Sequence, residues 1–219
     1  MLVEIIDPKK LKKIASGNVN IPRVYYDKSR IVRWLYWKRL NKLLMKAKHY
    51  APHASKVLDL GTGSGVFLPS LVKNYDYVAG VDRYTKDAKA LTKQLKLNLV
   101  DGDINQLPFD PNSFDIVFAA SVLEHFQDVE KPIQEIVRVL KPNGLFLSST
   151  PTENALYQVG RKVFGYVKPH DHYQSAKTVR LALMRFLKIE NKSHGPFPLG
   201  YELSAYELLV SRKNSQKIK

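Results

Sequence analysis

The chain contains no cysteine among its 219 residues. Disulfide bonds, thiolate nucleophiles and cysteine-liganded metal sites are therefore excluded, and the sequence is compatible with a reducing compartment. No apolar run approaches the roughly 20 residues that span a bilayer, so no transmembrane segment is predicted. The N-terminus, MLVEIIDPKK, lacks the basic-then-apolar order of a signal peptide. From these absences we predict a cytoplasmic location.

Acidic residues are also few, because 20 Asp and Glu stand against 35 Lys and Arg, which gives a formal net charge of +15. The excess lies in the flanks: the net charge is +10 for residues 1–50, −2 for residues 51–150 and +7 for residues 151–219. The flanks can therefore meet an anionic partner such as a phosphate-bearing substrate, a lipid surface or nucleic acid. The alternative is a basic, solvated surface without a partner.

Short apolar runs alternate with helical patterns, which predicts βαβ units and a parallel sheet. We expect strands at residues 56–60, 76–81, 97–103, 114–121, 144–150 and 206–213. We expect helices at residues 29–50, 66–74, 85–95, 128–140 and 176–187. The turn KPNG (residues 141–144) separates a helix from a strand, residues 151–172 are less regular, and the polar tail from Asn214 is predicted to be frayed.

The helix predicted at residues 29–50 is amphipathic and strongly basic. Its apolar side carries Val32, Tyr36, Leu40, Leu43, Leu44 and Ala47. Its basic residues are expected mostly around the other sides, and they are Arg33, Lys38, Arg39, Lys42 and Lys46. We expect this helix to cap a pocket, and its charge suits an anionic surface.

The stretch VLDLGTGSG, residues 57–65, joins a buried strand to a glycine-rich turn. No lysine follows in the P-loop position, and Val66 stands where the dinucleotide fingerprint needs a small residue, so neither phosphate motif fits. Asp82 follows Gly61 by the separation expected for a carboxylate that binds ribose hydroxyls. Asp103 ends the third strand before a loop, where a carboxylate can bind the amine of a base. Together these residues indicate adenosine without a pyrophosphate.

Four segments in this order resemble the class I S-adenosylmethionine-dependent methyltransferases. They are VLDLGTGSG, VAGVDRY, VDGDINQLPFDPNSFDIVFAASVLEHFQD and EIVRVLKPNGLFLSSTP. The sequence is most similar to the branch called type 11, which includes quinone and sterol C-methyltransferases. The resemblance runs from about Val57 to Pro151, and the chain departs from it at Asn143, where the family usually has glycine.

The resemblance implies an α/β fold with a Rossmann-like seven-stranded sheet, six strands parallel and the last antiparallel, and helices on both faces. YELLVSRK (residues 206–213) would be the last strand. We expect one domain at residues 1–219, with a basic helical N-terminal cap at 1–50 and a cofactor-binding core at 51–150. Residues 151–219 would supply a substrate cover and the last strands.

The resemblance also implies how the residues bind S-adenosylmethionine. Asp82 would bind the ribose hydroxyls, Asp103 the adenine amine and Ile104 the adenine ring. The methionine end and the reacting methyl would be held by Asp59, Gly61, Thr62, Gly63, Gly65, Ala120 and Ser121. Arg83 would stack on adenine or be solvated. The alternative for Asp59 is that it only orients the glycine turn. The alternative for Asp82 and for Asp103, each taken alone, is an ordinary carboxylate in a surface loop.

A proton acceptor for the methylated molecule is sought among the histidines, since their pKa lies near neutrality. The candidates are His125, His170 and His172, and His125 has the alternative of a structural role in the pocket wall. Tyr26, His125 and His172 are the candidate substrate contacts. No metal site is predicted, because His170, Asp171 and His172 would need a further ligand that the sequence does not reveal.

The leading function is methyl transfer to a small or lipid-like molecule. No N-P-P-Y segment follows the fourth strand and cysteine is absent, which argues against methylation of nucleic-acid bases. Two alternatives stay open: methylation of RNA or of a ribosome-associated protein, favoured by the basic flanks, and a noncatalytic S-adenosylmethionine-binding module.

Overall fold

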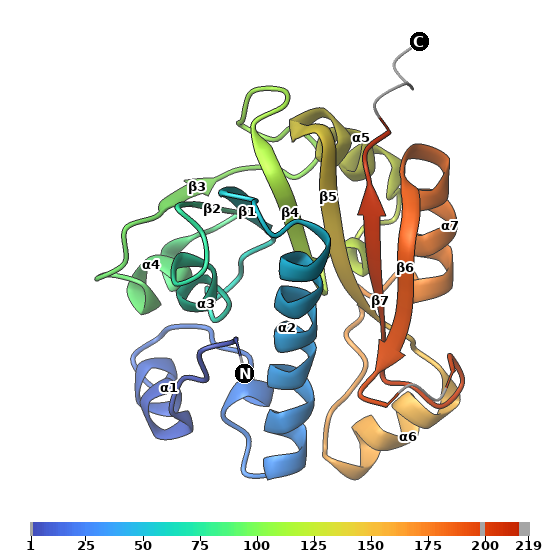
Figure 1. The fold of residues 1–219 in the computed structure, drawn as a ribbon. Coiled ribbons are helices and arrows are strands. Elements are labelled where there is room, and N and C mark those ends of the chain that lie inside the picture. Colours follow the sequence, from blue (N-terminus) through green and yellow to red (C-terminus); the bar gives the residue numbers. More distant parts are fainter. Residues whose placement is uncertain (1, 198–199, 215–219) are drawn as a thin grey trace.

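A computed structural model describes residues 2–197 and 200–214, so residues 215–219 of the tail predicted to be frayed lie outside the described residues. Figure 1 shows the order of the helices and strands along the chain. The helices are α1 (Pro8–Ala15), α2 (Arg30–Tyr50), α3 (Leu68–Val72), α4 (Lys86–Leu91), α5 (Glu130–Val139), α6 (Ala155–Val163) and α7 (Ala176–Phe186), with 3₁₀ turns η1 (Arg23–Tyr25) and η2 (Leu123–His125). The strands are β1 (Lys56–Leu60), β2 (Tyr77–Asp82), β3 (Asn98–Asp101), β4 (Phe114–Ala120), β5 (Leu140–Pro151), β6 (Lys188–Gly195) and β7 (Tyr206–Arg212).

The strands form one seven-stranded sheet in the order β3-β2-β1-β4-β5-β7-β6. Strand β7 is antiparallel to both of its neighbours, and the other six strands run parallel to one another. This confirms the predicted Rossmann-like sheet and its last, antiparallel strand. Strands β1 to β3 form one half of the sheet, and the chain then crosses over to form the other half from β4. The strand order therefore reverses between the neighbours β1 and β4, the switch point where ligands of open α/β sheets bind.

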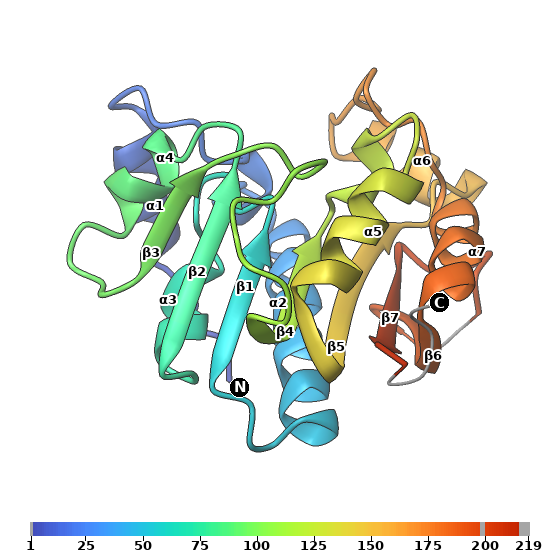
Figure 2. The ribbon, with the colours of Figure 1, turned by 90° about the horizontal axis from the view of Figure 1, so that it is seen from above.

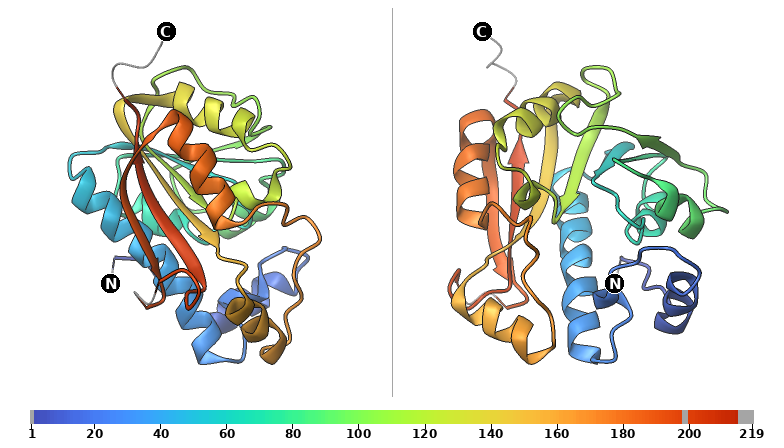
Figure 3. Two further views of the ribbon diagram at one scale, coloured as in Figure 1. Left: turned by 90° about the vertical axis from the view of Figure 1, so that its right-hand side faces the viewer. Right: turned by 180° about the vertical axis from the view of Figure 1, so that it is seen from behind.

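The central strands bury both of their faces, so alternate residues enter two separate cores. Leu58 and Leu60 of β1 pack with α5 and α7, whereas Val57 faces the other core with α2 and α3. Helices α1 to α4 pack into the core that contains Val57 and cover one face of the sheet. Helices α5 and α7 cover the other face (Figures 1 and 3).

Three elements have no counterpart in the sequence-based prediction. Strand β6, KIENKSHG, is an edge strand and only partly buried, so it shows no clear apolar alternation. Helix α1 buries only Leu11, and α6 buries no residue, so burial in the core stabilises neither helix strongly. Both begin at capping side chains instead: Asp7 accepts from the backbone N–H of Lys9 at 2.7 Å and Asn154 from that of Tyr157 at 2.7 Å.

The predicted turn at residues 141–144 is wrong as a boundary, because β5 begins at Leu140 and runs through these residues to Pro151. Asn143 has a φ of 61° within this strand, which is the left-handed conformation that asparagine tolerates. The strand pairs with Phe114 at Leu140 and again with Ile116 at Leu145, so the inserted residues form a bulge.

Helix α1, the N-terminal end of α2 and helix α6 lie at one end of the sheet (Figures 1 and 3). This is the end where the parallel strands β1, β4 and β5 finish, and the view from above in Figure 2 shows these strands side by side. The segments of the chain before β1 and after β5 therefore surround the switch point.

Candidate functional site

The glycine turn after β1 is left-handed at three positions, with φ of 65° at Gly61, 53° at Gly63 and 77° at Gly65. At Gly61 an added Cβ would lie 2.7 Å from Cγ2 of Val122, so no side chain fits there. At Gly63, by contrast, no heavy atom lies within 4 Å of such a Cβ, and the residue is exposed. The bare backbone at Gly63 is therefore open to close approach by a ligand.

Asp59 lies beneath this turn and is almost fully buried. The hydroxyl of Thr62 donates a hydrogen bond to its carboxylate at 2.7 Å. Burial raises the pKa of Asp59 to about 7, and the charge of Asp82 adds to the rise, while the bond from Thr62 opposes it. These contacts favour the alternative in which Asp59 orients the turn.

Asp82 connects the turn to the next strand, since its Oδ2 accepts a hydrogen bond from the backbone N–H of Gly63 at 2.8 Å. Asp82 is opposite Asp101 in the β2–β3 pair, so Asp103 follows two residues beyond, at the same edge. Strand β3 ends at Asp101, whereas the sequence-based prediction placed its end at Asp103. Asp103 instead closes a turn by accepting from Asn105, and its side chain is exposed.

The neighbouring candidates follow the same edge. Ile104, next to Asp103, is buried at 9% exposure, whereas Arg83 is exposed and forms no ion pair with a described residue. Ala120 and Ser121 end β4, beside β1, and both are half-buried. Ser121 has a φ of 61°, and its N–H donates to the carbonyl of Ser149 at 2.8 Å.

The guanidinium of Arg39 reaches this edge from α2 and is only 6% exposed. It donates to the hydroxyl of Ser121 and, at 3.4 Å, to the hydroxyl of Tyr25. Its buried Nε has no hydrogen-bond partner, and no carboxylate of the described residues forms an ion pair with it. A buried cation without an acidic partner suits an anionic ligand.

The prediction that Arg39 lies on the basic side of its helix is wrong. Arg39 follows Tyr36 by three positions and precedes Leu43 by four, so it belongs to the stripe that faces the sheet. This spacing was a signal in the sequence, but the charge of the residue concealed it.

Two of the three candidate histidines come together beyond η2. The rings of His125 and His172 meet edge to face with centroids 4.7 Å apart. Nδ1 of His125 is 3.0 Å from Oδ2 of Asp171, and Nδ1 of His172 is 2.8 Å from Oε1 of Glu153. His170 is exposed and has no hydrogen bond to this cluster within the described chain.

The histidine pair is held by further polar contacts. The backbone carbonyl of Glu124 accepts from the N–H of Tyr173 at 2.8 Å, which fixes the loop that carries His172 to η2. Glu153 also accepts two hydrogen bonds from Arg161, at 2.7 and 2.8 Å. Burial would raise the pKa of Glu153, but these bonds and the one from His172 together lower it.

The side chain of Glu124 is fully buried beside the pair. Neither of its carboxylate oxygens has a hydrogen bond of normal length and angle. Burial raises its pKa to about 6, although weak contact with its own backbone N–H, the charges of His125 and Arg39 and weak contact with the Ser121 hydroxyl act in the opposite direction. The sequence-based prediction did not include Glu124, Arg39, Glu153 or Asp171 in the site.

Tyr26 is half-buried and packs against the core on the α2 side. No hydrogen bond or ring contact joins it to the histidines in the described residues, so its role as a substrate contact stays a prediction. The joint between α2 and α6 is formed by other tyrosines, because the hydroxyls of Tyr36 and Tyr157 are 3.4 Å apart.

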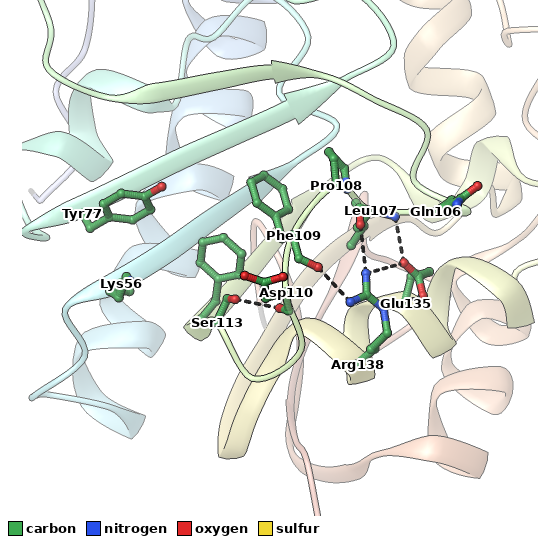
Figure 4. Close-up of a pocket in the computed structure, with 11 residues that line it drawn as sticks. Lys56, Tyr77, Gln106, Leu107, Pro108, Phe109, Asp110, Ser113, Glu135 and Arg138 are labelled. Atoms are coloured by element: carbon green, nitrogen blue, oxygen red, sulfur yellow. Dashed lines mark hydrogen bonds and ion pairs between the residues drawn. The ribbon is translucent and has the colours of Figure 1, made fainter.

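A cavity of about 700 Å³ lies elsewhere, at the amino ends of β1, β2 and β4 (Figure 4). Its main charged group is Arg138, which already donates to Glu135 and to the carbonyls of Leu107 and Phe109. Arg138 and Glu135 of this cavity thus already have partners, and the cavity is at the opposite edge from the glycine turn.

The raised pKa of Asp59 predicts how stability depends on pH. A carboxyl whose pKa is higher in the folded chain stabilises the fold below its unfolded pKa, and this contribution is lost as pH rises through about 7. The wild type should therefore lose about 2–3 kcal/mol of unfolding free energy relative to Asp59→Asn between pH 5 and pH 8. Urea denaturation at both pH values measures this. Asp110→Asn, an exposed acid, is the control, and equal pH slopes in wild type and Asp59→Asn would contradict the prediction.

Comparison with known proteins shows the family to which the chain belongs. Residues 58–148 match the family model described as a methyltransferase domain. A demethylmenaquinone methyltransferase of Staphylococcus saprophyticus is 31% identical over 160 residues, covering 68% of each chain. A sterol 24-C-methyltransferase of Aspergillus fumigatus is 36% identical over 119 residues, covering 47% of this chain and 31% of the relative. The chain therefore spans only about a third of that relative.

Among solved structures, the N-methyltransferase NodS of Bradyrhizobium japonicum, in complex with S-adenosylhomocysteine, has a TM-score of 0.68. It is 19% identical and the match covers 92% of this chain and 97% of that one, which shows a shared fold. Within the described residues, no helix has both the length and the apolar character to cross a membrane. With the sheet, the glycine turn and these matches, the chain belongs to the class I S-adenosylmethionine-dependent methyltransferases of type 11.

Proposed function

We propose that this chain transfers a methyl group from S-adenosylmethionine to a small or lipid-like acceptor. The observation that carries the proposal is the edge at the switch point. There an open glycine turn, the acid Asp82 and the buried, unpaired Arg39 face one region. A zwitterionic nucleoside needs these three kinds of group: a backbone it can approach, an acceptor for its ribose and a cation for its carboxylate.

The residues present fit this cofactor, which when bound supplies an activated methyl on sulfur. We assign the ribose to Asp82, the adenine amine to Asp103 and the adenine ring to Ile104. The methionine end is assigned to a set formed by Gly61, Thr62, Gly63, Gly65, Ala120 and Ser121. Asp59 supports the turn from below, and we add Arg39 as the partner of the methionine carboxylate.

Orientation is the main task of the chain in such a reaction, and it is worth about 7–11 kcal/mol of the barrier. The acceptor must be held in line with the methyl carbon while water is kept out. The segments before β1 and after β5 surround the site, which supports their proposed roles as cap and cover. The tyrosine contact between Tyr36 and Tyr157 joins these two segments.

The acceptor is activated in the histidine cluster. His125 and His172 each have one ring nitrogen engaged by a carboxylate and the other free, so either is suited to accept a proton or to bind a metal ion. The names of relatives favour a lipid-like acceptor, since they include sterol 24-C-, demethylmenaquinone and ubiquinone biosynthesis O-methyltransferases.

We extend the proposal to an anionic membrane surface, but through α6 and not mainly through the basic helix α2. The lysines of α2 are engaged within the fold: Lys42 donates to the carbonyl of Pro196 at 3.1 Å and Lys46 to Asn191 at 2.6 Å. Helix α6 instead carries exposed apolar residues beside basic ones, the pattern of interfacial helices. In α6 they are Leu156, Val159, Lys162 and Val163, and Val167 and Lys168 continue the pattern in the segment after the helix. The predicted cytoplasmic location stays a prediction.

Two other functions remain as outcomes of the tests. A methyltransferase for RNA or a ribosome-associated protein would bind RNA with an affinity that falls steeply with salt. A noncatalytic module would bind the cofactor without turnover of any acceptor.

The ribose assignment predicts that Asp82→Asn weakens binding of S-adenosylhomocysteine by about 1–3 kcal/mol, because charged hydrogen bonds to the ribose are lost. Titration calorimetry on the folded variant measures this. Asp110→Asn makes the same change at the opposite edge and should bind as the wild type does. Unchanged affinity in Asp82→Asn would remove the ribose assignment.

The carboxylate assignment predicts a different pattern for Arg39→Met. This variant should bind S-adenosylhomocysteine about 10- to 100-fold more weakly, which corresponds to about 1.4–2.8 kcal/mol. It should bind 5′-methylthioadenosine, which has no carboxylate, as the wild type does. Asp82→Asn should lose affinity for both ligands. If Arg39→Met lost affinity for both equally, Arg39 would only support the fold of the site.

The surface assignment predicts that the chain sediments with vesicles that contain phosphatidylserine and much less with pure phosphatidylcholine, since both charge and apolar area contribute. The double variant Val159→Ser, Val163→Ser should lose most of this binding. Leu181→Ser with Met184→Ser changes two equally exposed apolar residues of α7 and is the control. Equal loss in both double variants would contradict a role for α6.

A further inference from the structure

Glu124 has a buried carboxylate that the proposed cofactor site does not use. It is fully buried at η2, and both of its oxygens lack a normal hydrogen bond. A buried acid that lacks hydrogen-bond partners destabilises the fold. In native folds such a group is explained by strain, by a catalytic role or by a bound water or ion.

The two histidines next to Glu124 have the surroundings of metal ligands. In metal sites, a ligating histidine donates its other ring N–H to a carboxylate or carbonyl, which fixes the ring and its tautomer. Both histidines do this here: Nδ1 of His125 faces Asp171, and Nδ1 of His172 faces Glu153. Each ring is thereby left with Nε2 as an electron-pair donor.

The supporting carboxylates are themselves fixed in place. Glu153 is held by the two bonds from Arg161, and the loop with Asp171 and His172 is fixed by the bond from Tyr173 to the carbonyl of Glu124. Preorganised ligands of this type lose little freedom when they bind an ion. One potential ligand atom from each of Glu124, His125 and His172 lies within 4.8 Å of the other two.

We propose that Glu124, His125 and His172 bind one divalent transition-metal ion and that its open position takes an oxygen of the acceptor. Two histidines and one glutamate are a ligand set of catalytic zinc sites, which keep a fourth position for water or substrate. His125 is partly exposed, with 35% of its side chain accessible, so the ion can be reached from the mouth of the site.

The ion would act on the acceptor before methyl transfer, so this role rests on the proposed function. A hydroxyl bound to the ion releases its proton to solvent, because the positive charge favours the oxyanion. A lone pair of that oxygen then forms the bond to the methyl carbon while the carbon–sulfur bond breaks and its electrons stay on sulfur. The products are a methyl ether and a neutral thioether, and no further base is needed.

A role for the histidines as proton acceptors alone explains fewer features of the cluster. One histidine with one carboxylate is sufficient for a base. It leaves unexplained why a second histidine has the same arrangement and why Glu124 is buried between partners without a hydrogen bond. The sequence predicted no metal site because His170, Asp171 and His172 lacked a further ligand. In the structure His170 lies outside the cluster, and Glu124, from another segment of the chain, lies beside His125 and His172.

Metal binding by the full chain tests this proposal. The protein is first stripped with a chelator and then titrated with Zn²⁺ alone in a calorimeter. We expect one ion per chain, and about 100-fold weaker binding in His172→Ala and Glu124→Gln. Asp171→Asn, which removes only the support of His125, should weaken binding about 10- to 100-fold. The controls His53→Ala and His170→Ala should bind as the wild type does.

Two further readouts separate this site from the cofactor site and from misfolding. All five variants should bind S-adenosylhomocysteine with wild-type affinity, so loss of zinc binding alone marks the metal site and leaves the proposed function untouched. Zn²⁺ should also raise the thermal midpoint of the wild type but not that of His172→Ala. A wild type that binds no Zn²⁺, or variants that bind it equally well, would overturn the proposal.

The open position is tested with Co²⁺ in place of Zn²⁺. Acetohydroxamate, a simple oxygen ligand, should shift the visible absorption bands of the Co²⁺ protein if a coordination position is free. An unchanged spectrum at saturating acetohydroxamate would overturn the role of the ion in binding an acceptor oxygen.

Discussion

The close approach of a ligand to bare backbone at the end of β1 is the constraint on which the rest of the site depends. Three left-handed glycines form this turn, and at Gly61 the side chain of Val122 fills the space that a Cβ would need. Val122 in turn begins the segment that carries Glu124 and His125. The geometry of the glycine turn and the position of the histidine cluster are therefore coupled through one van der Waals contact.

Charge is distributed around this edge in a way that the folded chain alone does not balance. Asp59 and Glu124 are buried acids whose pKa values burial raises to about 7 and about 6, and Arg39 is a buried cation without an ion-pair partner. Buried charges without partners destabilise a fold. Arg39 and Glu124 interact through charge but form no ion pair, so in the two proposals above ligands complete the site: a carboxylate binds Arg39 and a cation binds Glu124. These buried charges make the ligand-free fold less stable than one with neutral residues at the same positions. The same charges favour binding of ligands that carry the opposite charge.

The sequence was most informative where local backbone chemistry determines the structure. The glycine turn and Asp82 were found from spacing because strand, turn and strand follow one another within a short stretch, and the antiparallel strand β7 came from the family resemblance. Arg39, Glu124 and Glu153 were missed since their roles depend on contacts between segments far apart in the chain. Strand β6 was missed because an edge strand need not alternate, and its partner β7 provides most of the pairing.

The two sides of the site are held by different forces, and this bears on how ligands enter. The core strands are held by apolar contacts buried on both faces, whereas α6 buries no residue. The cover is held by polar contacts, such as those from Tyr166 to Asp27 at 2.6 Å and from Tyr173 to Glu124. Water can replace such contacts at small net cost, but it cannot replace apolar burial. Under the proposed function, the cover opens for an apolar acceptor while the cofactor edge keeps its shape, and α6, with its apolar side exposed, is the part that meets the proposed membrane first.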